Sequence, residues 1–230
     1  MITGTYLFDP DLARCFDEAF ENAGIAPAAI GVDHIASALR SCEFMLNSEW
    51  STYGIRQWMV LKGTFTTTPG DLDVALPAGT IDVFWSSLRR NGAETPMHPI
   101  SRSDYESISK KDGRGRPNQY FVDKQYNGCT MFLYQAPENS TDVVVYSIFK
   151  QMADVGSMAN TLHMPAVAKD CFVYGLAMRL AWKFNKAAYG ELKNMYGGEG
   201  YPDRIGGKLF HMRAETGERA DTKMTIARRR

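Results

Sequence analysis

The longest apolar stretch of this chain is residues 165–184, PAVAKDCFVYGLAMRLAWKF. Its proline suits a helix start, because the first N–H groups of a helix have no intrahelical partner, and most of its other residues favour a helix over a strand. At about 100° per residue, one narrow side carries Lys169, Phe172, Leu176, Arg179 and Lys183. Every other side is apolar apart from Asp170. We therefore expect a buried helix, at the centre of a core or between neighbouring subunits, and its charges argue against a membrane span.

The charge of the chain is balanced in total but uneven along its length. The 230 residues include 26 basic and 26 acidic side chains, so no net charge draws the chain to nucleic acid or to an anionic membrane. Residues 1–50 hold eight acids and two bases, whereas residues 204–230 hold eight bases and three acids. This asymmetry predicts an acidic body and a basic arm.

The cysteines and the first residues of the chain indicate the cellular compartment in which the protein is expected. The four cysteines are widely separated, and we interpret them as reduced core residues of a cytosolic protein and not as a disulfide framework. No signal-peptide pattern opens the chain, so we expect no secretion.

Two helices are predicted before residue 53. Asp9-Pro10-Asp11 supplies a cap and an early proline for a helix through about Ala23, which Gly24 ends. Asp33 is predicted to cap a second helix that reaches about Trp50.

From Gly54 the composition changes to β-branched and aromatic residues, which favour strands. Asn127-Gly128 predicts a hairpin turn, and the segment 101–109 predicts a short helix. The predicted strands are residues 55–68, 72–76, 80–88, 119–124, 129–135 and 142–152.

After the long apolar helix, a second short helix is predicted over residues 185–196. The remaining chain is rich in charge and glycine, a composition that does not fold by itself. It is either disordered or an arm that orders on a partner, and its recurring apolar residues favour the arm. We expect removal of residues 204–230 to leave the fold intact.

No catalytic, metal or cofactor site is predicted. The four histidines are isolated, no cysteine or histidine pair has zinc spacing, and no G-x-S-x-G elbow is present. The basic loop, which is Lys110, Lys111, Arg114 and Arg116, could contact phosphates. A solvated hairpin tip is the interpretation that we favour for it. The alternative function that this loop and the C-terminal arginines leave open is a nucleic-acid-binding module.

Five short motifs occur in a characteristic order: LPAGT at 76–80, LRRNG at 88–92, PISRSDY at 99–105, GRPNQYF at 115–121 and LYQAP at 133–137. Their order and spacing, with the helix at residue 165, resemble the head–tail connector proteins of short-tailed bacteriophages, also called portal adaptors or tail tubular protein A-like proteins. The resemblance covers about residues 8–198.

The resemblance implies a structural virion protein of the phage neck, assembled in the host cytoplasm, and not an enzyme. Such adaptors form a homo-oligomeric ring, commonly a dodecamer, that binds the portal protein on one side and the tail nozzle or tail tube protein on the other. A tail fibre or spike is a further possible partner. DNA passes through the ring without sequence preference during genome ejection, and no membrane and no cofactor is involved.

These observations together predict an α+β fold. Residues 1–53 and 161–198 form a helical bundle, residues 54–160 an inserted antiparallel β domain, and residues 199–230 an extended basic C-terminal arm. The residues expected in a portal-docking arm are Lys208, Leu209, Phe210, Met212, Arg213, Met224, Ile226, Arg228, Arg229 and Arg230. The residues expected on the inter-subunit side of the long helix are Lys169, Phe172, Leu176, Arg179 and Lys183.

Overall fold

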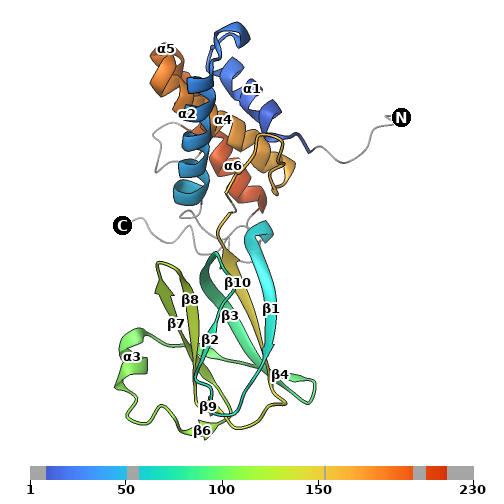
Figure 1. Cartoon of the computed structure of the whole chain (residues 1–230), viewed down its shortest axis with the longest axis vertical. Coiled ribbons are helices and arrows are strands. Elements are labelled where there is room, and N and C mark those ends of the chain that lie inside the picture. Colours follow the sequence, from blue (N-terminus) through green and yellow to red (C-terminus); the bar gives the residue numbers. More distant parts are fainter. Residues whose placement is uncertain (1–8, 51–56, 153, 199–205, 217–230) are drawn as a thin grey trace, which may run out of the picture. The chain divides into compact units, whose positions relative to one another are not determined.

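A computed structural model of the chain describes residues 9–50, 57–152, 154–198 and 206–216 (Figure 1). The fold is mixed helix and sheet. The chain divides into two compact units, each considered by itself below. The helical unit comprises residues 1–58 and 153–230, and the β unit comprises residues 59–152.

The N-terminal helices of the helical unit lie close to the predicted ranges. Helix α1 spans Leu12–Asn22, and the side chain of its N-cap residue Asp11 accepts a hydrogen bond from the N–H of Arg14 at 3.0 Å. Gly24 follows with a φ of 71°, a conformation that glycine adopts without strain.

Helix α2 spans Val32–Phe44 and continues as a π-helical turn over Met45–Trp50. Its N-cap is Gly31 and not Asp33, which lies in the first turn instead. There the carboxylate of Asp33 still complements the positive end of the helix dipole.

Helix α4, Ala166–Phe184, is the centre of the helical unit. It packs against α1, α2, α5 (Lys186–Gly197) and α6 (Gly207–Thr216), and Figure 1 shows it crossing the middle of this unit. Its N-cap is Pro165. Eleven of its nineteen residues are buried, which confirms the prediction of a buried helix. The physical reason is that a helix with apolar side chains around most of its circumference needs neighbours on several sides.

Helix α6 corrects one prediction. An extended arm was expected from residue 199 onward, but residues 207–216 are helical and pack on α4 and α5. Leu209 and Met212 lie three residues apart, so they share one face of the helix, and both are buried. Burying these two side chains offsets the low apolar content of the segment. The other parts of the predicted arm, residues 199–205 and 217–230, lie outside the described residues.

The β unit contains two four-stranded sheets and a short two-stranded pair. The first sheet has the order β1-β10-β3-β4 and the second has the order β2-β8-β7-β5, while β6 pairs with β9. The strand bounds are β1 Val60–Thr66, β2 Asp73–Ala75, β3 Thr80–Arg90, β4 Ala93–Pro96, β5 His98–Pro99, β6 Arg114–Gly115, β7 Gln119–Gln125, β8 Gly128–Tyr134, β9 Ala136–Pro137 and β10 Val143–Lys150. Helix α3, Arg102–Ser107, begins at its N-cap Ser101.

One apolar core joins the two sheets. Along β8, Cys129, Met131 and Leu133 alternate with more exposed residues and point into this core. Val144 and Ile148 of β10 come from the other sheet. The sheets are antiparallel except at β5 with β7, and the β6–β9 pair is also parallel, a departure from the antiparallel domain that the strand pattern predicted.

Candidate assembly surfaces

Two apolar residues expected on the inter-subunit side of α4 lie inside the chain. Phe172 and Leu176 have no exposed surface, and the ring of Phe172 meets the ring of Trp50 edge-on at a centroid distance of 6.4 Å. Because the helical unit already covers both side chains, neither contacts a second subunit in this conformation. The helix pattern places them beside basic residues but does not show which neighbours cover that side.

Lys169 is also buried. Only 4% of its surface is exposed, and its ammonium group donates a hydrogen bond to Oδ1 of Asp9, just before α1. This hydrogen bond lowers the pKa of the Asp9 carboxyl. The pair ties the start of α4 to the segment that leads into α1.

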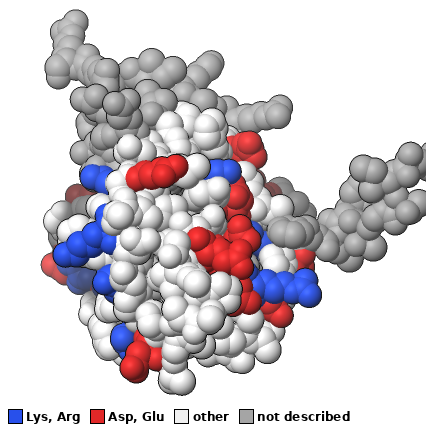
Figure 2. Space-filling model, turned by 90° about the horizontal axis from the view of Figure 1, so that it is seen from above, with Lys and Arg blue, Asp and Glu red and all other residues white. Residues whose placement is uncertain are grey.

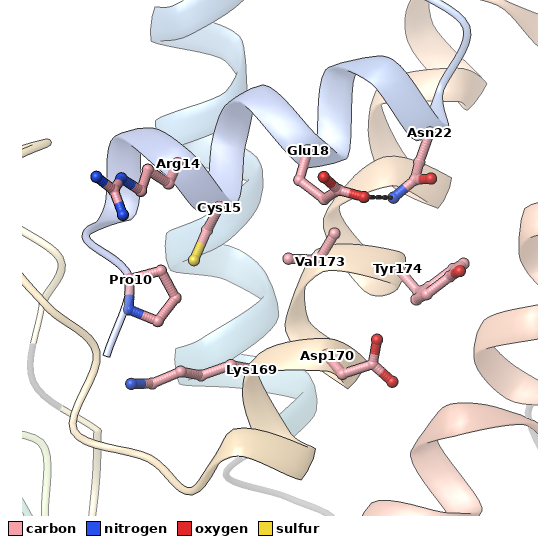
Figure 3. Close-up of a pocket in the computed structure, with 9 residues that line it drawn as sticks. All are labelled: Pro10, Arg14, Cys15, Glu18, Asn22, Lys169, Asp170, Val173 and Tyr174. Carbon is pink, nitrogen blue, oxygen red and sulfur yellow. Dashed lines mark hydrogen bonds between the residues drawn. The ribbon is translucent and has the colours of Figure 1, made fainter. Parts of the chain in front are cut away.

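Lys169 lines a hollow of about 370 Å³ between α1 and α4 (Figure 3). Pro10, Cys15 and Val173 supply apolar walls. At the upper right of Figure 3, the side-chain amide of Asn22 donates a hydrogen bond to Oε1 of Glu18. Burial raises the pKa of the Cys15 thiol, so the thiol stays protonated at neutral pH. Cys15 is therefore not an activated nucleophile in this hollow.

The other two basic residues of α4 bond to different elements of the same unit. Arg179 donates to Oε2 of Glu49 in the π-helical turn at 2.8 Å. Lys183 donates to the hydroxyl groups of Ser37 and Ser41 on α2 at 2.9 and 2.6 Å. Burial lowers the pKa of Lys183, with smaller contributions from nearby arginines. These contacts tie α4 to α2 and to the π-helical turn of its own chain, while Lys183 stays exposed and Arg179 half-buried.

A buried polar network joins the π-helical turn to α5. The hydroxyl of Tyr196 donates to Oε1 of Glu49 at 2.7 Å and accepts from Nε1 of Trp50 at 3.0 Å. Burial, reinforced by the nearby Glu49 carboxylate, raises the pKa of Tyr196 well above its usual value. Sequence reasoning missed this network, because its members are far apart in the chain.

The predicted docking-arm residues divide between the core of the helical unit and its surface. Leu209 and Met212 are buried, whereas Phe210 is 40% exposed. Lys208 donates to Oδ2 of Asp170 at 2.5 Å, and this hydrogen bond raises its pKa. Arg213 is half-buried on the same helix. The remaining members, Met224, Ile226, Arg228, Arg229 and Arg230, lie outside the described residues.

The basic loop belongs to the β unit. Lys110, Arg114 and Arg116 are exposed, and Arg116 donates to Oγ1 of Thr95 at 2.8 Å. Lys111 is half-buried, donates to two backbone carbonyls and lies 5.5 Å from the ring centre of Tyr105. Two of the four side chains are thus engaged by the chain itself.

The outward faces of α1 and α5 carry opposite charge. Asp17, Glu18 and Glu21 are exposed on α1, and Lys186 is exposed on α5. Seen from above in Figure 2, basic side chains gather toward the left of the view, while acidic side chains gather right of centre beside a basic group. Trp182, at the end of α4, is 57% exposed.

The described residues also bear on metal binding and on membrane insertion. Within the described ranges, no three His, Cys, Asp or Glu side chains are grouped to hold a metal ion. None of the described helices is both long enough and apolar enough to cross a membrane.

Comparison with known proteins identifies the family. The family model described as SU10 adaptor protein matches residues 13–216, which includes α1 at its start and α6 at its end. No curated protein matches the chain. The match confirms the resemblance to the adaptors of short-tailed phages. The chain therefore belongs to the SU10 adaptor protein family.

Proposed function

We propose that this protein forms a ring, commonly twelvefold, that joins the portal vertex of the capsid to the tail nozzle or tail tube. Double-stranded DNA passes through the channel of this ring during genome ejection. The observation that carries the proposal is the family match over residues 13–216, which covers both units of the chain. The role is structural, and the ring assembles in the host cytoplasm before it becomes part of the virion.

The surface charges of the helical unit support a role beside moving DNA. Exposed carboxylates of the N-terminal helices α1 and α2 include Glu18, Asp33 and Glu43. Carboxylates repel phosphates, so a surface of this kind would not hold DNA in transit. A protein that must let the genome slide past benefits from weak contact with it.

The portal-docking surface is proposed to combine exposed Phe210 with the residues that follow Thr216. Leu209 and Met212 are used inside the helical unit, so they are not available for a partner. Exposed Phe210 and the basic residues 219–230 remain candidates for contact with the portal. A charged segment that folds on binding can cover a large partner surface.

The test uses the full-length chain and the purified portal protein of the same phage. Native mass spectrometry and negative-stain imaging of the mixture should show a ring of adaptor subunits on the portal ring. A chain that stays monomeric and never binds the portal would overturn the proposal. Addition of the nozzle or tube protein should then extend the assembly on its free side, and a tail fibre or spike can be tested in the same way.

Nucleic-acid binding is the alternative that the same material can test. A nucleic-acid-binding module would bind duplex DNA with an affinity that falls steeply as the salt concentration rises. Removing the charges of Lys110, Arg114 and Arg116 would then abolish that binding. The engagement of Lys111 and Arg116 within the chain argues for the adaptor instead.

A further inference from the structure

The outward face of α1 is acidic, and two of its carboxylates, those of Asp17 and Glu21, form no ion pair with any residue that the structure describes. The opposite face of α1, with Phe16 and Phe20, is buried in the helical unit. Asp17 and Glu21 lie on the exposed side, about one helical turn apart. This leaves two negative charges free to meet a positive surface.

The outward face of α5 provides such a positive surface. Lys186 and Lys193 are seven residues apart, so they lie about 20° apart around the helix axis. Within the described part of the chain, neither lysine is in an ion pair. Lys186 is exposed and Lys193 half-exposed.

Gly190 lies between these two lysines on the same face. Glycine is a poor residue for a helix interior, so a specific packing contact often explains it. Here a Cβ atom added at Gly190 would meet nothing within 4 Å. No contact within the described chain therefore requires a glycine at this position, whereas its absent side chain leaves a shallow place where another helix can approach closely.

An exposed aromatic group stands beside this face. Trp182 packs against Tyr189 of α5 at a ring-centre distance of 4.9 Å, and the ammonium group of Lys186 lies 5.6 Å from its ring. More than half of Trp182 is still exposed. Tryptophan is among the residues that contribute most energy to protein interfaces, and here it is held in place by its neighbours.

The two faces do not neutralise each other within one chain. Helices α1 and α5 both pack on α4 with their apolar sides, so their charged sides point outward. Each face also holds one charge of the other sign, Arg14 on α1 and Glu191 on α5. The two faces are thus complementary in charge but different in residues, as a head-to-tail contact requires.

We propose that α1 of one subunit docks on the α5 face of the next subunit, with Asp17 and Glu21 opposite Lys186 and Lys193 and with Trp182 at the edge of the contact. This inference rests on the proposed ring, because a head-to-tail contact that is repeated between copies closes a ring when the rotation per subunit fits. A second copy of this chain is the occupant of the α5 face.

The experiment uses charge reversal and rescue in the full-length chain on its purified portal ring. D17K/E21K and K186E/K193E should each lower the assembled fraction at least tenfold, as measured by native mass spectrometry, because like charges then face each other. The chain with all four substitutions should recover assembly, since opposite charges face again. D71K/D112K makes the same charge change on exposed acids of the β unit and should assemble like the unaltered chain.

Cross-linking tests the same contact by a second route. Carbodiimide joins carboxylates to amines only when they touch, so a mixture of ¹⁵N-labelled and unlabelled chains should give mixed-isotope links between α1 and α5. Unchanged assembly of both double variants, or the absence of such links in assembled rings, would overturn the inference while leaving the proposed ring intact. Failure of the unaltered chain to assemble on the portal would instead overturn the proposed function, and this inference with it.

Discussion

The hydroxyl of Tyr196 donates a hydrogen bond to the carboxylate of Glu49 across 147 residues of sequence, at 2.7 Å. The same hydroxyl accepts from Trp50, so it holds the C-terminal end of the π-helical turn to α5. Tyr196 has no exposed surface, and the turn precedes the segment that leads to the β unit. This contact should therefore decide how firmly the end of α2 is held.

Removing this hydroxyl tests the network. Tyr196→Phe should lower the free energy of unfolding by about 1–3 kcal/mol, because buried polar groups lose a hydrogen-bond partner. Urea denaturation should show a lower midpoint at an unchanged slope. Tyr189→Phe, the same change on half-buried Tyr189, should alter stability by less than about 0.5 kcal/mol. If both variants lower the free energy of unfolding equally, the hydrogen-bond network does not contribute to stability.

Two glycines in helices of this unit should respond in opposite ways to alanine. A Cβ atom at Gly175 would lie 2.7 Å from both Sδ of Met45 and a ring carbon of Tyr196, so Gly175→Ala should cost about 1–3 kcal/mol of stability. At Gly190 the new methyl group meets nothing, and Gly190→Ala should stabilise the subunit by about 0.5–1 kcal/mol. Thermal unfolding of the two variants beside the parent chain measures both. A stabilised Gly175→Ala chain would refute the close packing of α4 with α5.

Cys42 should make the protein sensitive to alkaline pH. Burial raises the pKa of its thiol from an ordinary value of 9.0 to about 12. Between these values the folded chain holds a proton that the unfolded chain loses, so stability falls as pH rises from about 9 toward 12. The slope from this one group is at most about 1.4 kcal/mol per pH unit.

Cys42→Ala should lose this contribution. The free energy of unfolding of both chains should be measured by denaturation at pH 8, 9 and 10. As pH rises over this range, the parent chain should lose stability relative to the variant. A constant difference over this range would mean that the thiol titrates normally in the folded chain.

Asp9 should make the stability of the protein depend on pH in the acid range. Its pKa is lowered below 3.8 by the hydrogen bond from Lys169, so its stabilising contribution is complete above about pH 3.8 and is lost as pH falls through the folded-state pKa. Asp9→Asn should unfold at a lower temperature than the parent chain at pH 6, and the gap should narrow near pH 2.

Lys169→Met serves as the counterpart to Asp9→Asn. It replaces a buried charge by an apolar side chain of similar length and leaves the half-exposed Asp9 to water, so it should be the milder change. The reverse order of the two variants would contradict the burial of Lys169.

Truncation should distinguish α6 from the residues that follow it. A chain that ends at Thr216 should keep the unfolding temperature of the full chain, whereas loss of residues 204–230 should lower it, contrary to the expectation from composition. Met212→Ala should cost about 2–5 kcal/mol, because Met212 is fully buried. Phe210→Ala, on the same helix but exposed, should change stability little. A stable chain without residues 204–230 would restore the view of this region as a separate arm.

Local patterns by themselves determined much of the fold. Helix α1 lies where Asp11 could cap it and ends before Gly24, and β7 and β8 form the predicted hairpin, with Tyr126-Asn127 as its turn and Gly128 as the first residue of β8. The apolar circumference of α4 was enough to predict its burial. Such features are readable because capping, turn geometry and periodicity depend on residues within a few positions of each other.

The tertiary structure alone decided what the charges of α4 do. Lys169, Arg179 and Lys183 bond to residues 160, 130 and 146 positions away, so no local pattern could reveal those partners. The same holds for α6, whose composition predicts an arm but whose Leu209 and Met212 find cover on α4 and α5. Whether a side chain is buried depends on which distant segments fold against it, because burial is a property of the assembled core and not of the segment.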